Sequence, residues 1–325
     1  MRKISFSQAT LEAMEEEMGL NDKIFVMGED IARQGGVFGQ FKGLAAKFPG
    51  RVLDTPISET FIIGGGGMGA AIAGTRPVVD MHFADFLGVA MDEVLNQMAK
   101  MRYMFGGQTK MPLVLRAPDG MTIQGAAQHS QSVEAWVTHI PGVKVVTPSN
   151  PYDAKMLLKA AIRSDDPIIY FENKILYKEK AEVPEKEDEQ PYTLGKAKIV
   201  RQGKDVTIVS YSIGMKAAMG AAELLAKEGI EAEVIDLITL SPWDREAVFE
   251  SVKKTHRLCI CHEAVKQGGF SAEIAAVVAE ELMEYLDAPI LRYGAPFCPI
   301  PFAPTLEKMV RVYPEDLYKG IKGMF

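Results

Sequence analysis

The stretch Asp54-Thr55-Pro56-Ile57-Ser58-Glu59 runs into an apolar segment, 60–74, that contains Gly64-Gly65-Gly66-Gly67-Met68-Gly69. Residues 51–53, just before it, are typical of a β-strand, and Pro56 indicates a turn. Glycines have no side chain, so a helix that carries them can pack very closely against a neighbour. The pattern therefore places an acidic residue, Glu59, at the edge of a buried region.

Three interpretations of this stretch are open. Gly64, Gly66 and Gly69 have the spacing GxGxxG, which is typical of a dinucleotide-binding turn with residues 61–63 as its strand and Asp80 as its ribose acid. Only residues 70–73 separate the last of these glycines from Gly74-Thr75-Arg76-Pro77, which is too short for the helix of that motif. In the second interpretation Glu59 is the functional group and the glycines allow close packing against a neighbouring subunit or sheet. In the third, Glu59 only caps the helix that it precedes.

The length, charge and cysteine content of the chain limit the class of protein to which it can belong. The chain has 325 residues, which favours two domains, and its net charge of −7 with scattered Lys and Arg gives no basic face for nucleic acid or an anionic membrane. Its three cysteines match no zinc spacing, and Cys259 and Cys261 are interpreted as small hydrophobic residues of one strand face. No apolar run reaches the length of a membrane span, and we expect a cytoplasmic protein.

Strand-like and helix-like segments alternate along the chain without hairpin signals. This order predicts an α/β fold with largely parallel sheets and helices on both faces. A first helix is expected from a Ser7 cap to Gly19, a long helix from Asp85, and a third helix from Pro151 to Arg163. Strands of the first domain are expected at 24–27, 51–53, 77–81, 111–115, 143–146 and 167–171.

A charged segment without periodicity separates this series from a second one. It gives the domain division 1–177, linker 178–194 and 195–325. The second domain is expected to be a smaller α/β unit. Its predicted strands lie at 206–210, 232–237, 257–261 and 290–293.

Six blocks of sequence together resemble a known family. They are 55–59 (TPISE), 83–86 (FADF), 96–103 (NQMAKMRY), 129–132 (HSQS), 141–146 (PGVKVV) and 236–242 (DLITLSP). In this order they resemble the beta subunit of the thiamine-diphosphate-dependent first component of 2-oxo acid dehydrogenase complexes. The resemblance implies a pyrimidine-binding, transketolase-like first domain and a transketolase C-terminal-like second domain.

The resemblance implies roles for several residues of the first domain. Glu59 matches the family's buried glutamate, which shares a proton with the aminopyrimidine ring of thiamine diphosphate. Phe86 would pack against that ring, with Ile57 and His82 nearby, although relatives more often carry Gln or an apolar residue at position 82. His129 matches the active-site histidine that faces the substrate.

The family also implies a structural potassium ion held mainly by backbone carbonyls. The matching positions are Leu113, Ala161, Ile162, Ser164 and Asp166, where relatives often have an acid in place of Ser164. The magnesium-binding cradle for the diphosphate, which begins with Gly-Asp-Gly in this superfamily, is missing, because Pro118-Asp119-Gly120 lacks the first glycine. Magnesium and the diphosphate must then be held by an alpha subunit.

Partners follow from the same resemblance. Relatives form heterotetramers of two alpha and two beta chains and dock onto an acyltransferase core with a lipoyl domain. Glu284, Asp287 and the terminal carboxylate of Phe325 are acidic candidates for that docking surface, and an ordinary solvated face is the alternative.

The substrate is suggested by three strings, 85–89, 102–108 and 126–136. They resemble the acetoin dehydrogenase branch of the family, with pyruvate or a branched-chain 2-oxo acid as the second choice. A nicotinamide oxidoreductase and a catalytically silent scaffold subunit remain as alternatives from other classes.

Overall fold

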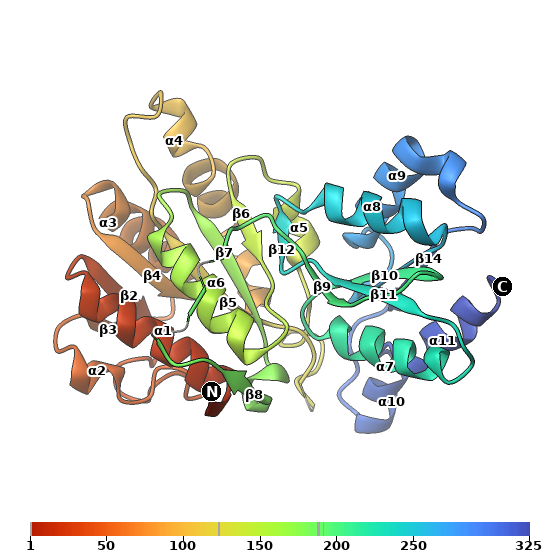
Figure 1. Ribbon diagram of the computed structural model, residues 1–325. Helices are drawn as coiled ribbons and strands as arrows, with labels where there is room; N and C mark the ends of the chain where they lie inside the picture. Colours follow the sequence, from red (N-terminus) through yellow and green to blue (C-terminus); the bar gives the residue numbers. More distant parts are fainter. Residues whose placement is uncertain (1, 123, 187–188, 191) are drawn as a thin grey trace. The chain divides into compact units, whose positions relative to one another are not determined.

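The computed structural model describes residues 2–122, 124–186, 189–190 and 192–325. The chain divides into two compact units, the first made of residues 1–119 and 136–194, the second of 120–135 and 195–325. Each unit is built on its own sheet (Figure 1). The predicted α/β fold with two domains is confirmed.

The sheet of the first unit is parallel throughout. Its strands follow the order β6-β7-β5-β4-β2-β3, and each pairs in parallel with its neighbours. Their bounds are β2 (Ile24–Gly28), β3 (Val52–Asp54), β4 (Arg76–Asp80), β5 (Val114–Asp119), β6 (Lys144–Val146) and β7 (Ile168–Asn173). Parallel strands end at the same edge of a sheet, so the residues that follow β2, β3 and β4 lie near one another.

Helices and one small sheet complete this unit. α1 (Phe6–Leu20) and α6 (Pro151–Arg163) pack against each other, and Lys155 of α6 binds Glu16 of α1 at 2.8 Å (Figure 1). The remaining elements are β1 (Arg2–Ser5), α2 (Leu44–Lys47), η1 (Phe61–Met68), α3 (Gly69–Ile72), η2 (Ala84–Gly88), η3 (Glu93–Met98), α4 (Met101–Met104), η4 (Leu176–Lys178) and β8 (Lys180–Val183), with α5 (Glu134–Thr138) at the boundary of the units.

Three local expectations differ from the structure. The N-cap of α1 is Ser5, not Ser7, because Ser5 and Gln8 form a reciprocal capping box. The expected long helix from Asp85 is divided into η2, η3 and α4. The charged segment after residue 177 contains β8, which pairs antiparallel with β1.

The glycines of 64–67 lie in η1, a π-helix, and pack it against its surroundings. A Cβ at Gly67 would lie 3.0 Å from Val79 of β4, and one at Gly64 would lie 2.9 Å from Glu93 of η3. The glycines therefore serve close packing, here against the sheet and η3. The dinucleotide interpretation is wrong, since residues 61–63 are helical and Asp80 is buried in β4.

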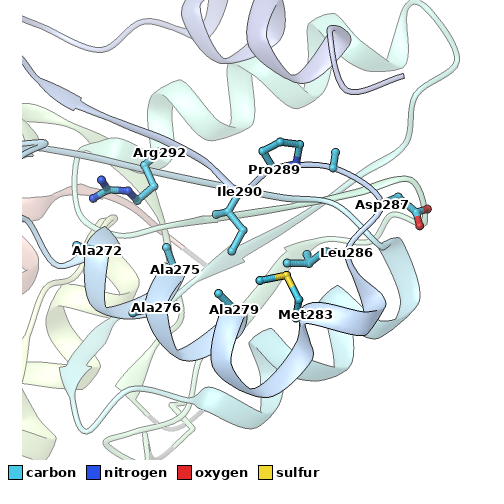
Figure 2. A pocket seen from close by; sticks show the side chains of 11 residues that line it. Ala272, Ala275, Ala276, Ala279, Met283, Leu286, Asp287, Pro289, Ile290 and Arg292 are labelled. Carbon is cyan, nitrogen blue, oxygen red and sulfur yellow. The ribbon is translucent and has the colours of Figure 1, made fainter.

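The second unit has a mixed sheet of five strands in the order β14-β13-β10-β11-β9, in which only β9 runs antiparallel. Its elements are β9 (Lys198–Arg201), β10 (Val206–Ser210), α7 (Gly214–Ala226), β11 (Ala232–Asp236), β12 (Thr239–Ser241), α8 (Arg245–Thr255), β13 (Leu258–Val265), α9 (Ser271–Leu282), η6 (Met283–Tyr285), β14 (Leu291–Ala295), α10 (Pro304–Met309) and α11 (Pro314–Lys322). The alanines of α9 line a groove of about 710 Å³ with Met283 and Ile290 on its wall (Figure 2).

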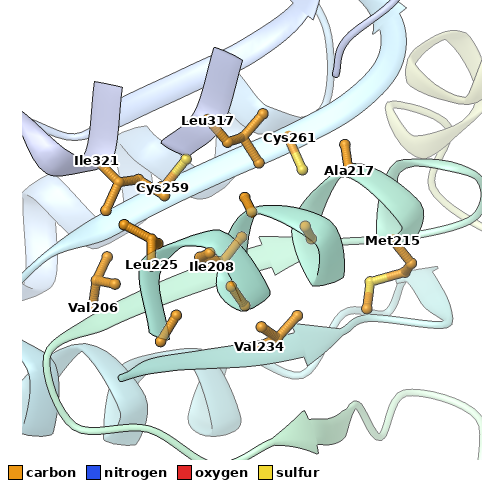
Figure 3. Close-up of a cluster of buried hydrophobic side chains, with 14 residues drawn as sticks. Val206, Ile208, Met215, Ala217, Leu225, Val234, Cys259, Cys261, Leu317 and Ile321 are labelled. Atoms are coloured by element: carbon orange, nitrogen blue, oxygen red, sulfur yellow. The ribbon is translucent and has the colours of Figure 1, made fainter. Parts of the chain in front are cut away.

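The core of this unit lies where α7 and α11 meet the sheet (Figure 3). Leu225 of α7 and Ile321 of α11 are fully buried there, together with Ile208 of β10. Cys259 and Cys261 belong to the same cluster and are unpaired, which confirms their interpretation as small hydrophobic residues.

Candidate active site at the carboxyl ends of the strands

Acidic residues gather where the parallel strands of the first unit end. Glu29 follows β2, Glu59 follows β3 at the start of η1, and His82 follows β4. A backbone hydrogen bond from Thr55 N to Gly28 O, 2.9 Å long, ties the end of β3 to the end of β2. Glu29 and Glu59 are each 9% exposed, so both carboxyls lie at the rim of the buried region.

Glu29 and Glu59 influence each other electrostatically. Burial raises the pKa of Glu29, with His82 opposing the shift and the Glu59 carboxylate adding to it. In the part of the chain that the structure describes, no hydrogen bond or ion pair engages the Glu59 carboxylate, and the first turn of η1 has no side-chain cap. The helix-capping interpretation therefore has no hydrogen bond to support it.

His82 is held in a strained position beside these acids. Its φ is +64°, in the left-handed region, and its backbone N donates to Asp80 Oδ2 at 3.2 Å. The ring Nδ1 lies 4.0 Å from Glu29 Oε2 and is buried without a hydrogen-bond partner among the described residues. Strain of this kind is concentrated at functional sites.

Aromatic and apolar side chains surround the same edge. The ring of Phe83 packs edge-on against His82, with centroids 5.2 Å apart, and against Phe86, 5.9 Å apart. Ile57 is 82% exposed and Phe61 is 48% exposed. An acid without a hydrogen-bond partner among the described residues, beside uncovered apolar side chains, fits the aminopyrimidine ring of thiamine diphosphate.

The buried charge cluster beneath this edge was not predicted from the sequence, although Asp80 was considered in another role. Arg116 of β5 and Glu172 of β7 form a fully buried ion pair, and Asp80 of β4 lies beside it. Burial raises the pKa of Asp80 to about 6, against the opposing charge of Arg116. Glu29 also went unpredicted, although it is an acid that directly follows a strand, β2.

His129 lies in the segment 120–135, which clusters with the second unit, whereas the sequence analysis assigns this segment to the first domain. This segment groups with the second unit because its residues contact residues that lie far away in the sequence. For example, Met121 N donates to Glu263 Oε2 at 3.1 Å. His129 is half-buried. The structure thus brings Glu59, His82, Phe86 and Ile57 together in one unit and places His129 in the other.

The five residues of the expected potassium site are close together, but a guanidinium already binds there. Arg76 donates through Nε to Ile162 O at 3.0 Å and through Nη2 to Ser164 O at 2.5 Å. The carbonyl oxygens of Leu113 and Ala161 accept backbone hydrogen bonds, and the carboxylate of Asp166 binds Arg102 and Lys144. Carbonyl oxygens suit potassium, but these positive charges do not, so the residues as arranged do not fit this ion.

Two of the candidates for partner docking meet at Arg257. Its Nη1 lies 3.8 Å from Asp287 Oδ2, and its guanidinium stacks 4.3 Å above the ring of Phe325. Asp287 also stands at one end of the groove along α9 (Figure 2). Glu284 belongs to η6, next to this groove.

The described residues contain neither a cluster of metal-binding side chains nor a membrane-spanning helix. No group of three or more His, Cys, Asp and Glu residues there is arranged to hold a metal ion. No helix there has the length and apolar character that a membrane span requires.

Comparison with known proteins identifies the class of protein to which this chain belongs. Residues 2–180 match the family "Transketolase, pyrimidine binding domain", and residues 195–317 match "Transketolase, C-terminal domain". A solved "Split gene transketolase, inactive beta4 tetramer" has a TM-score of 0.80 at 25% identity and covers 99% of this chain and 98% of its own. The fold and the site together define a transketolase-like α/β protein.

Similar sequences specify the family further. A "2-oxoisovalerate dehydrogenase subunit beta" of Bacillus subtilis is 44% identical over 100% of this chain and 99% of its own length. An "Acetoin:2,6-dichlorophenolindophenol oxidoreductase subunit beta" of Cupriavidus necator is 46% identical over 95% and 93%. A "Pyruvate dehydrogenase E1 component subunit beta" of Rickettsia felis is 44% identical over 98% of both chains. The chain belongs to the beta subunits of thiamine-diphosphate-dependent 2-oxo acid and acetoin dehydrogenases.

Proposed function

We propose that this chain is the beta subunit of an acetoin dehydrogenase, which cleaves acetoin and passes the two-carbon unit to a lipoyl carrier. The observation that carries the proposal is the carboxylate of Glu59, in a chain of this family. It lies largely buried at the strand ends, without a hydrogen-bond partner among the described residues. Thiamine diphosphate, when bound, supplies the carbanion chemistry. Glu59 would hold one proton and exchange it with the pyrimidine ring, and Ile57, His82 and Phe86 would contact that ring.

An alpha subunit completes the proposed enzyme. The sequence lacks the Gly-Asp-Gly cradle, so the alpha subunit holds magnesium and the diphosphate, in an assembly of two alpha and two beta chains. An acyltransferase core with its lipoyl domain docks near Asp287 and Phe325, which Arg257 brings together. The cytoplasm remains the predicted compartment.

The charges around His129 favour a neutral substrate. Segment 120–135 contains no Lys or Arg. Among the described residues, the side chains that bind it include Glu263, Glu307, Tyr211 and Arg311, and Arg311 is already paired with both glutamates. A 2-oxo acid brings a carboxylate that needs a cation, whereas acetoin is neutral and needs a base for its hydroxyl proton, which His129 can accept.

The alternative is a pyruvate or branched-chain 2-oxo acid dehydrogenase, since relatives with those names are 44% identical. The test is to assemble the chain with its alpha subunit and to compare kcat/KM for acetoin, pyruvate and 2-oxoisovalerate with an artificial electron acceptor. We expect acetoin to be preferred. A preference of tenfold or more for either 2-oxo acid, about 1.4 kcal/mol in transition-state binding, would overturn the acetoin assignment. The chain alone serves as the control and should show no turnover.

A further inference from the structure

The segment that carries His129 is a closed loop. Gly120 N donates to Gln131 O at 3.0 Å, and this hydrogen bond joins the two halves of the loop, one before and one after residue 127. Gly125 lies so close to the opposite half that an added Cβ would be 2.5 Å from Ser130 Oγ and 3.2 Å from the carbonyl oxygen of His129. The position of His129 therefore depends on the conformation of the whole loop.

Part of this loop is strained. Gln124 has φ +63° and Ala126 has φ +57°, and neither is a glycine. A residue in this region persists only where its surroundings determine the conformation. The loop must therefore be held by groups outside it.

Three side chains of the second unit hold the loop by its backbone. Glu263 of β13 accepts hydrogen bonds from Met121 N at 3.1 Å and from Ser132 Oγ at 3.4 Å. Glu307 of α10 accepts a hydrogen bond from Gln124 N, one of the strained residues, at 2.7 Å. Arg311 donates from Nη2 to Thr122 O at 3.1 Å.

Arg311 also joins the two acids. Its Nη1 lies 3.7 Å from Glu263 Oε1, and its Nη2 binds Glu307 Oε1. The side chains of Glu263, Glu307 and Arg311 are 9%, 5% and 19% exposed. Charge-assisted hydrogen bonds shielded from water are stronger than those between neutral groups. We call these three residues the loop clamp.

We propose that the loop clamp positions His129 for the reaction, with Arg311 as its central positioning residue. The inference rests on the proposed function of His129, but the clamp itself can be tested without activity. A residue with only a general role in stability would lower the unfolding temperature without a local effect on the loop. A positioning residue loosens the loop and lowers kcat while the protein stays folded.

The experiment uses the complete enzyme assembled with its alpha subunit. Hydrogen–deuterium exchange of the amides of 120–135, read by mass spectrometry, is compared in the wild type, Arg311→Ala and Arg311→Lys. Arg311→Ala should exchange about tenfold faster at Met121 and Gln124 and should lose about tenfold in kcat with a smaller change in KM. Arg311→Lys should have an exchange rate and a kcat between those of the wild type and Arg311→Ala. Added guanidinium ion should restore part of the kcat of Arg311→Ala.

Arg201→Ala is the matched control. Arg201 binds Glu231 at 2.8 Å in the same unit, and its side chain is 26% exposed. It has no hydrogen bond or ion pair with the described residues of the loop, 120–122 and 124–135. It should change neither exchange in 120–135 nor kcat. If Arg311→Ala fails to fold, Glu307→Gln replaces it, because the amide keeps the size of the side chain and removes its charge.

Unchanged exchange in the loop of either clamp variant would overturn the inference. Faster exchange with wild-type kcat would also overturn it, provided that His129→Ala lowers kcat. If His129→Ala retains full activity, the proposed role of His129 is wrong instead. In that case the exchange data still decide whether the clamp holds the loop.

Discussion

The guanidinium of Arg116 binds the carboxylate of Glu172 through two hydrogen bonds, Nε to Oε1 at 2.5 Å and Nη2 to Oε2 at 2.8 Å, and both side chains are fully buried. The ring of Phe41 covers the guanidinium at 4.5 Å. Since the two charges neutralise each other, Asp80, which lies beside them, is an extra buried carboxyl. It should therefore influence how stability depends on pH.

Asp80→Asn is predicted to stabilise the protein at neutral pH. Burial raises the pKa of Asp80 from 3.8 to about 6. The folded state therefore holds this proton more tightly than the unfolded state, and the resulting stability is complete below pH 4 and lost as the pH rises through 6. The loss is roughly 3 kcal/mol, so the variant should gain on the order of 1–3 kcal/mol at pH 7.5 and little at pH 4.5.

Urea unfolding at pH 4.5, 6 and 7.5 measures this difference. Asp165→Asn is the control with the opposite sign, because hydrogen bonds from Lys110 and Arg76 lower the pKa of Asp165. It should lose a little stability at neutral pH and none once the pH falls below the folded-state pKa. A constant difference between the wild type and Asp80→Asn at all three pH values would contradict the prediction.

His262 is predicted to make the second unit sensitive to acid. Its ring is neutral and buried, with Nδ1 donating to Ala264 O at 3.0 Å and Nε2 accepting from Ser271 Oγ at 2.7 Å. Burial lowers the pKa of His262 from 6.5 to about 4, so stability is complete above pH 6.5 and falls as the pH drops toward 4. The loss should reach roughly 2 kcal/mol at pH 5.

His262→Gln removes this titration. The variant should be less stable than the wild type at pH 7.5, because it loses hydrogen bonds, but its stability should fall less between pH 7.5 and pH 5. His139→Gln, at an exposed position, should follow the wild-type curve. Parallel curves for the wild type and His262→Gln would refute this explanation.

Much of the fold could be predicted because its signals are local. The apolar strand 206–210 has the predicted bounds, and the helix that begins at Pro151 ends at Arg163 as expected. The sequence-based predictions were wrong where a contact between particular residues determines the local structure. Ser5 and Ser7 both precede the first helix, and only the reciprocal bond with Gln8 selects Ser5. The π-helices η1 and η3 pack against each other, with Glu93 close to Gly64, and no local pattern reveals this approach.

The candidate site was predictable where a residue lies in a recognisable block or directly follows a strand. Glu59 meets the first condition. The neighbouring carboxyl of Glu29 meets the second and was still missed. The loop clamp was out of reach of sequence patterns, because Glu307 and Gln124 are far apart in the chain and meet only through tertiary packing. Arg76 likewise reaches Ser164 only in the folded sheet.

Gly67→Ala is predicted to destabilise the first unit. A Cβ at Gly67 would lie 2.8 Å from the carbonyl oxygen of Ile62 and 3.0 Å from Val79, and the backbone cannot easily move away. We expect a loss of about 1–3 kcal/mol from overpacking. Gly69→Ala is the matched control, since its nearest neighbour would be 3.8 Å away and alanine favours a helix by up to about 1 kcal/mol.

Thermal unfolding of both variants decides this point. The expected order of midpoints is Gly69→Ala at or above the wild type and Gly67→Ala below it. If both alanines lower the midpoint equally, a backbone effect common to the glycines, rather than close packing at Gly67, would be responsible.

Glu59→Gln is predicted to suppress cofactor activation while the assembly stays intact. Glutamine keeps the size of the side chain and one oxygen, but it cannot give and take a proton as the carboxyl does. If that exchange is essential, the barrier rises by roughly 2–5 kcal/mol. The direct measurement is hydrogen–deuterium exchange at the thiazolium carbon of thiamine diphosphate in the assembled variant. Glu29→Gln is the neighbouring control, because it removes a nearby carboxyl and leaves Glu59 in place, and it should slow the exchange less. An unchanged exchange rate in Glu59→Gln would show that the carboxyl at this strand end does not activate the cofactor.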